Sequence, residues 1–164
     1  MILFINLMQF SMPTLIAKLK RDLFTPLREV CGKGILVTDE KGKSYRLKIQ
    51  SPSALSALFQ IDKYIITDGA KCDSMILVDD GDLHTQVLIE LKGNDICHAI
   101  EQLDATLRAP LLQHKSINNR WARVVAQTIP MSASRKVIER AKVQFVKKYN
   151  CDLKLKSNFM EEYI

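Results

Sequence analysis

The chain has 164 residues, a length typical of one globular domain that buries roughly 70% of its unfolded surface without disulfide staples. Its composition is that of an ordinary folded domain, with 47% hydrophobic residues, 26% charged residues and a formal net charge of +6. Four scattered cysteines form no Cys-x-x-Cys pair and no zinc-binding pattern with the histidines, which argues against a zinc site and favours a reduced compartment, the cytoplasm.

The first ten residues are apolar, but they have no basic start and no small-residue cleavage site, and they are too few to span a bilayer. We therefore expect no targeting segment and no membrane partner. As an N-terminal extension these residues would lengthen the first helix, form an edge strand, or lie upstream of the true start, since Met8 and Met12 could each initiate.

The next sixty residues predict two helices and a hairpin. Apolar residues with helical spacing and flanking prolines predict a helix over 13–24. Alternating residues in 34–37 and 45–49, around a polar turn, predict a β-hairpin. A serine cap and a proline predict a short helix over 51–59, and 64–66 would add a short strand.

A second hairpin is predicted further along the chain. The apolar runs 72–78 and 85–91 alternate like strands, and the Asp-Asp-Gly-Asp cluster between them indicates a tight turn. Because side chains alternate along a strand, Glu90 and Lys92 share one face while Leu91 faces the other way.

The register of this hairpin decides where Asp73 lies. A two-residue loop centred on Gly81 and Asp82 sets Asp73 directly opposite Glu90, and a loop shifted back by one residue sets it diagonal to Glu90. A three-residue loop without a bulge would move Asp73 to the other face. Both two-residue loops predict a cluster of Asp73, Glu90 and Lys92.

Two carboxylates on an apolar sheet are costly to desolvate unless a cation offsets their charge. Magnesium takes oxygen ligands and keeps several waters, so Asp73, Glu90 and the backbone carbonyl of Leu91 would suffice as protein ligands. Lys92 could then orient a water beside a scissile phosphate and offset the charge of the transition state.

Asp73, followed after 16 residues by Glu90-Leu91-Lys92 on an apolar strand that feeds a helix, resembles the motif of the PD-(D/E)XK, or restriction-endonuclease-like, nuclease superfamily. The resemblance covers about 71–130 and departs from the motif at Cys72, which stands in place of proline. It implies an α/β fold with an αβββαβ core whose central mixed sheet is flanked by helices, and the length of the chain predicts a single domain over 1–164. A C-terminal helix and a short strand would follow this core.

An acid-any-lysine triplet is weak on its own, since about 1.7 are expected by chance in this composition. The chain has three, beginning at Asp39, Glu90 and Asp152. The triplet at Asp39 lies in a predicted turn, and the one at Asp152 has no acidic strand paired before it. Only the triplet at Glu90 has a preceding acidic strand, an apolar back face and a following helix.

The rest of the chain predicts a helix over 94–109, a strand over 120–129, a helix over 134–149, a strand near 153–156 and a frayed acidic tail. Gln102 falls on one flank of the first of these helices. It resembles a glutamine found at this place in branches of the superfamily, although a boundary residue without a task would look the same.

Charge is segregated along the sequence. Residues 1–50 carry a net +5, residues 51–107 carry −7 and residues 108–164 carry +8. An acidic centre between basic segments suits a cation site beside bound phosphates, although lysine-rich helices also occur simply as soluble faces. Candidate nucleic-acid contacts are Lys71, Arg120, Arg123, Arg135 and Lys136.

These observations predict a Mg²⁺- or Mn²⁺-dependent nuclease that hydrolyses phosphodiester bonds of DNA, acting as an endonuclease, with a homodimer or a protein partner supplying specificity. The alternative is a non-catalytic nucleic-acid-binding or assembly subunit that keeps the nuclease fold. A small-molecule enzyme has little support, because the six glycines are dispersed and form no phosphate-binding loop.

Overall fold

The computed structural model describes residues 12–39, 41–129 and 133–164, with the side chains at 133 and 134 left out. The expectation for the first ten residues lies outside these ranges. Within them, no helix combines the length and the apolar character needed to cross a membrane.

The described residues fold into helices and strands that alternate along the chain. In order, they are α1 (Leu15–Arg21), β1 (Arg28–Cys31), β2 (Ile35–Thr38), β3 (Ser44–Lys48), β4 (Leu55–Gln60), β5 (Ser74–Asp80), β6 (Leu83–Lys92), α2 (Ile96–Arg108), the 3₁₀ helix η1 (Pro110–Leu112), β7 (Asn119–Ala126), α3 (Ala133–Tyr149), β8 (Cys151–Ser157) and β9 (Phe159–Tyr163).

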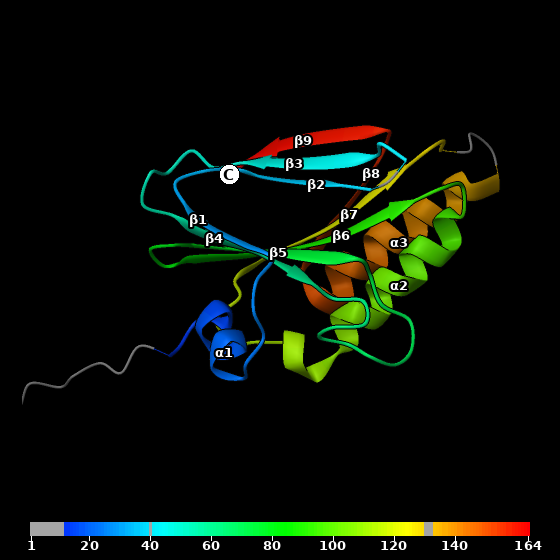
Figure 1. Ribbon diagram of the computed structural model, residues 1–164. Coiled ribbons are helices and arrows are strands. Elements are labelled where there is room, and N and C mark those ends of the chain that lie inside the picture. Colours follow the sequence, from blue (N-terminus) through cyan, green and yellow to red (C-terminus); the bar gives the residue numbers. More distant parts are fainter. Residues whose placement is uncertain (1–11, 40, 130–132) are drawn as a thin grey trace, which may run out of the picture.

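Six strands form the central sheet, in the order β1-β4-β5-β6-β7-β8 (Figure 1). The pairs from β1 to β6 are antiparallel, whereas β6 pairs with β7, and β7 with β8, in parallel. Parallel neighbours need a crossover connection. Helix α2 makes the crossover from β6 to β7, and α3 lies on the path from β7 to β8.

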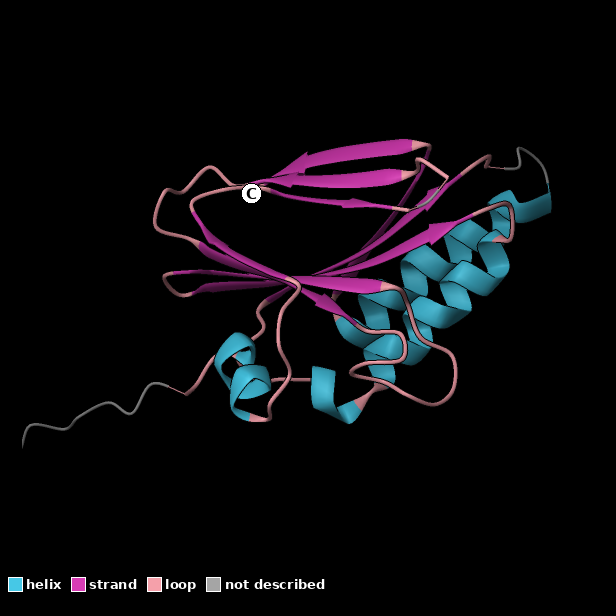
Figure 2. Ribbon diagram, in the orientation of Figure 1, coloured by secondary structure: helices cyan, strands magenta, loops and turns pink. Residues whose placement is uncertain are grey.

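The two faces of this sheet are covered differently (Figure 2). The helices pack on one face, and their apolar residues join a core that includes Leu88 and Ala122. A three-stranded sheet of β2, β3 and β9 covers the other face, around a second core that includes Tyr45, Val87 and Met160. The expected α/β fold with a mixed central sheet flanked by helices is confirmed, with a small sheet in place of helices on the second face.

Helix α2 begins and ends where its sequence indicates. The side chain of Asp95 caps the helix by accepting a hydrogen bond of 3.0 Å from the backbone N–H of His98. The helix ends before Pro110, and its buried residues recur every three or four positions: Ile96, Ala99, Ile100, Leu103 and Leu107. This stripe fixes α2 against the end of β6.

Three local predictions were wrong. Residues 55–60 form strand β4, not a helix, because this strand is buried on both faces and so shows no polar alternation. Residues 64–66 form no strand, only a single bridge between Asp62 and Ile66. The acidic end is not frayed, because it forms β9, which pairs in parallel with β3.

Candidate functional site

The β5–β6 hairpin places Asp73 across from Glu90. Asp80 pairs with Leu83, and Ser74 pairs with Ile89, so Gly81 and Asp82 form a two-residue loop. Gly81 has φ 57°, as such a loop requires. The first of the two alternative two-residue registers is therefore the one observed.

Backbone hydrogen bonds lock the two acids together. The N–H of Asp73 donates to Oε2 of Glu90 over 3.0 Å, and the N–H of Leu91 donates to Oδ2 of Asp73 over 2.9 Å. The carboxylate of Glu90 thus accepts from the backbone of Asp73, and the carboxylate of Asp73 accepts from the backbone of the residue after Glu90. The strand register places the two backbone donors, and the two carboxylates accept from them.

Helix α2 positions the lysine beside these acids. The ammonium of Lys92 lies 3.6 Å from Oε1 of Glu90 and donates to Oε1 of Gln102 over 2.9 Å. The amide nitrogen of Gln102 donates in turn to the carbonyl of Lys71 over 2.9 Å. Gln102 therefore links the end of β6 to the segment that leads into β5.

The surroundings of Asp73 and Glu90 disfavour the charged forms of both carboxyl groups. Burial first, and then the charge of Asp73, raises the pKa of Glu90 to about 8, although Lys92 opposes this shift. Burial also raises the pKa of Asp73, against the effects of the Leu91 N–H and of Lys92. Glu90 is only 1% exposed. Two carboxylates are thus held together in a place where neither ionises easily.

A divalent cation fits this donor set. Among the described residues, Oδ1 of Asp73 has no hydrogen-bond partner, and the ion-pair partner of Oε1 of Glu90 is Lys92. Oxygen donors of this kind suit Mg²⁺ or Mn²⁺, which need few protein ligands because they retain water. The described ranges contain no group of three or more His, Cys, Asp or Glu side chains arranged for a metal, so the carbonyl of Leu91 would have to supply a third ligand.

The predicted nucleic-acid contacts fall into separate places. Arg135 and Lys136 are exposed in the first turns of α3. Lys71 lies next to the acids, but its ammonium donates to the carbonyl of Thr67 over 3.0 Å and lies 3.5 Å from Asp62. Lys71 contributes to the site through its backbone carbonyl, the acceptor for Gln102.

Arg123 cannot serve as a nucleic-acid contact, because its side chain is fully buried between the two sheets. Its guanidinium pairs with Glu162 over 2.5 Å and with Asp152 over 3.0 Å, and lies 4.8 Å from the centre of the Trp121 ring. The prediction for Arg123 was wrong. Alternation along a strand did not reveal that a second sheet covers this face.

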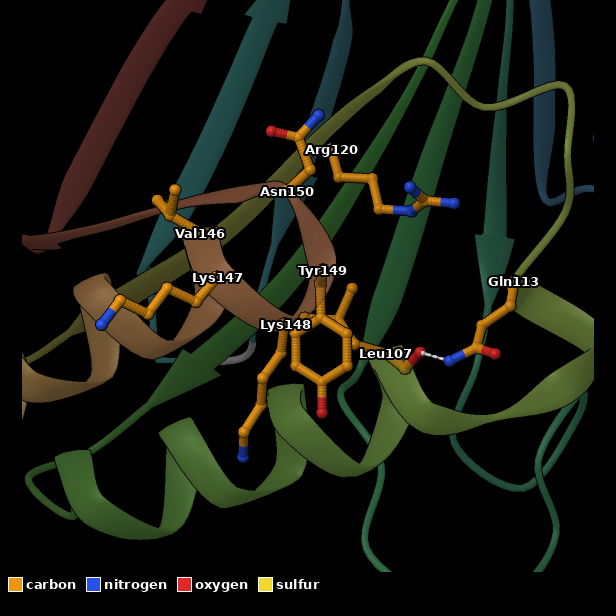
Figure 3. A pocket seen from close by; sticks show the side chains of 8 residues that line it. All are labelled: Leu107, Gln113, Arg120, Val146, Lys147, Lys148, Tyr149 and Asn150. Atoms are coloured by element: carbon orange, nitrogen blue, oxygen red, sulfur yellow. Dashed lines mark hydrogen bonds between the residues drawn. The ribbon is translucent and has the colours of Figure 1, made fainter.

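Arg120 lies far from the acids. It pairs with Gln86, and Glu90 lies four residues further along β6, a separation of about 13 Å along the strand. It lines a cavity of about 420 Å³ near the end of α3. Figure 3 shows Lys147 and Lys148 of this cavity extending in different directions, so their charges do not converge.

The turn between β2 and β3 lies beside the end of β6, a proximity that no feature of the sequence predicted. Asp39 and Lys43 form a 2.8 Å ion pair in this turn. Together with Lys41 they line a cavity of about 300 Å³ whose other side is made by Leu91 and Gly93. The acid-any-lysine triplet that begins at Asp39 resembled a chance occurrence in the sequence. The packing of the small sheet on the central sheet brings this turn to the end of β6.

Comparison of the chain with known protein families, with curated proteins and with solved structures found no match in any of the three. The fold and the geometry of the acid pair are therefore the basis for assigning a function.

Proposed function

We propose that this protein is a nuclease that hydrolyses phosphodiester bonds of DNA with the help of Mg²⁺ or Mn²⁺. The observation that carries this proposal is the pair formed by Asp73 and Glu90, held together by backbone hydrogen bonds with raised pKa values beside the ammonium of Lys92. Perturbed groups gathered in this way are typical of functional sites, because a structural role alone does not require two repelling carboxylates.

The arrangement of the elements supports the proposal. Helix α1 precedes the antiparallel strands β4, β5 and β6, which α2 connects to β7, parallel to β6. This is the order of helix, three strands, helix and fourth strand that the superfamily resemblance implies. Under this proposal, strands β1 to β3 would be additions to that core, between α1 and β4.

Each side chain has a chemical role in this proposal. Asp73 and Glu90, with the carbonyl of Leu91, would hold the cation, which when bound supplies positive charge to the phosphate oxygens. Lys92 would donate a hydrogen bond to the attacking water and offset negative charge as it develops. Gln102 is a positioning residue, because it holds the Lys92 ammonium.

The direct test is cleavage of supercoiled plasmid and of single-stranded DNA. We expect cutting with Mg²⁺ or Mn²⁺ and none with EDTA. Lys92→Ala should lower the rate about 10²- to 10³-fold, the usual cost of losing one donor to a developing charge. Lys115→Ala, which removes an exposed lysine from the loop before β7, is the matched control. Equal rates for Lys92→Ala and the parent would refute the role of Lys92.

One observation favours a non-catalytic nucleic-acid-binding or assembly subunit instead. The ammonium of Lys92 is already bonded to Gln102 and close to Glu90, so the cluster is also consistent with a purely structural network. In that case DNA binding would weaken steeply with salt, would not need metal and would yield no product. Specificity for particular DNA would come from a homodimer or a protein partner under either proposal.

A further inference from the structure

The turn between β2 and β3 lies beside the end of β6. Residues from both elements line one cavity of about 300 Å³: Asp39, Lys41, Lys43, Leu91 and Gly93. Leu91 packs toward the core between the two sheets, whereas Glu90 and Lys92 project from the opposite face of the strand. The cavity is therefore one residue away from Lys92, on the side of the small sheet.

Hydrogen bonds within the turn hold its shape. Oδ1 of Asp39 accepts from the backbone N–H groups of Lys41 and Lys43, over 3.0 and 2.8 Å. The N–H of Asp39 donates to the carbonyl of Lys43 over 3.0 Å, and Gly42 adopts φ 82°. Asp39 thereby organises the backbone that presents both lysines to the cavity.

The charge of the cavity suits an anion. Lys43 is only 4% exposed, and its ammonium has three donors. Among the described residues it has one charged partner, Oδ2 of Asp39 at 2.8 Å. A buried ammonium gains from further acceptors, and exposed Lys41 adds a second positive charge. Among the described lining residues, two lysines and one aspartate give a net positive charge.

We propose that this cavity binds a phosphate group of a nucleic-acid strand, adjacent to the phosphate at Asp73, Glu90 and Lys92. A phosphate offers several charged oxygens to Lys41 and Lys43, and charge-assisted hydrogen bonds of this type are the strong ones. The position of the subsite along a cleaved strand rests on the proposed nuclease function. Phosphate binding by the turn can be measured separately from cleavage.

A titration followed by NMR tests the subsite without any cleavage. ¹⁵N-labelled protein in EDTA would be titrated with inorganic phosphate and, separately, with a short oligodeoxythymidylate. We expect the amide signals of Lys41, Lys43 and Gly93 to shift with both, and at lower concentration with the oligonucleotide. A response to inorganic phosphate alone would overturn the assignment to a nucleic-acid strand. No response at these amides would overturn the subsite.

Variants identify the side chains. Lys41→Gln changes an exposed side chain and should keep the fold, whereas Lys43→Gln removes a buried charge, so its fold must be checked by circular dichroism. Lys115→Gln is the control. Lys41→Gln and Lys43→Gln should each reduce the slope of log Kd against log salt by about 0.7 for single-stranded DNA, the effect of losing one phosphate contact. They should also raise KM with kcat retained.

The outcomes separate this inference from the proposed function. If the parent protein cuts DNA but Lys41→Gln keeps the parental salt slope and KM, the subsite is refuted and the nuclease stands. If the parent binds DNA through the turn but never cuts it, the nuclease is refuted and the subsite stands.

Discussion

The backbone N–H of Asp73 donates a 3.0 Å hydrogen bond to Glu90, and this bond fixes the separation of two acids whose charges repel. The Leu91 N–H holds the other carboxylate in the same way, over 2.9 Å. Because both donors are backbone groups of β6 or of the residue before β5, rotating either carboxylate away breaks a hydrogen bond to the backbone. A proton on Glu90 relieves this repulsion, and a bound cation would do the same.

Replacing one acid should stabilise the cation-free protein. Glu90→Gln keeps the acceptor for the Asp73 N–H but removes the cost of either protonating Glu90 or burying its charge on folding, so we expect the melting temperature near pH 7.5 to rise by about 2 to 6 °C in EDTA. Differential scanning calorimetry would measure this change in melting temperature. The control is Glu139→Gln, which removes an exposed acid from α3. A loss of stability in Glu90→Gln would show that the acid pair is not strained.

The stability of the cation-free protein should depend on pH through Glu90. The unfolded chain releases this proton near pH 4.5, whereas the folded chain keeps it up to about pH 8. The folded state therefore binds more protons in this window, and the free energy of unfolding falls as pH rises. Urea titrations from pH 5 to 8 should show this fall in the parent and a weaker one in Glu90→Gln. Parallel curves would contradict the prediction.

Divalent cations should raise the stability of the parent protein. A ligand that binds only the folded state stabilises it by about 2.7 kcal/mol at a hundred times its Kd. Mg²⁺ or Mn²⁺ should therefore raise the melting temperature of the parent, and EDTA should reverse the effect. Asp73→Asn should respond much less. A rise of equal size in both proteins would place the cation elsewhere.

Gln102 should affect turnover more than substrate binding. Gln102→Leu removes the acceptor that holds Lys92 and the donor to Lys71. We expect kcat to fall about 10- to 100-fold, the usual effect of losing a group that orients a ligand or catalytic residue, with KM little changed. Gln144→Leu, at an exposed position of α3, controls for a lost surface amide. An unchanged kcat would show that Gln102 lies at the boundary of the apolar stripe of α2 without a role in turnover.

The pair of Arg123 with Glu162 should contribute strongly to stability. Glu162→Gln leaves the buried guanidinium without its closest charge, and losing one partner of a buried pair costs about 3 to 5 kcal/mol. Glu161→Gln is the matched control, because Glu161 bonds to partly exposed Arg46 and Lys48 and such pairs contribute less than about 1 kcal/mol. Similar unfolding midpoints for the two variants in urea would contradict this role.

The local geometry of the acid pair could be predicted from the sequence because it depends on short-range rules. The turn residues restrict the loop length, the loop length sets the register, and strand alternation then places Asp73, Glu90 and Lys92 on one face. The glutamine on α2 follows from helical periodicity in the same way. None of these steps requires knowing which distant segments meet.

The errors arise where distant segments do meet. The small sheet of β2, β3 and β9 buries Arg123, gives Glu162 a partner and brings the turn at Asp39 to the end of β6. When each is considered alone, Arg123 on its strand and the acidic C-terminal end are both expected to be exposed to solvent. The ion pair between Arg123 and Glu162 explains both mistakes, because each charge is stabilised by the other.

The most direct measurement is the anomalous scattering of crystals soaked in Mn²⁺. The account predicts a peak between Asp73 and Glu90, with carboxylate oxygens of both residues about 2.0 to 2.3 Å from the ion, and no such peak in Asp73→Asn crystals. Well-diffracting crystals of the parent protein with no peak there, or with Mn²⁺ bound only by other residues, would contradict it.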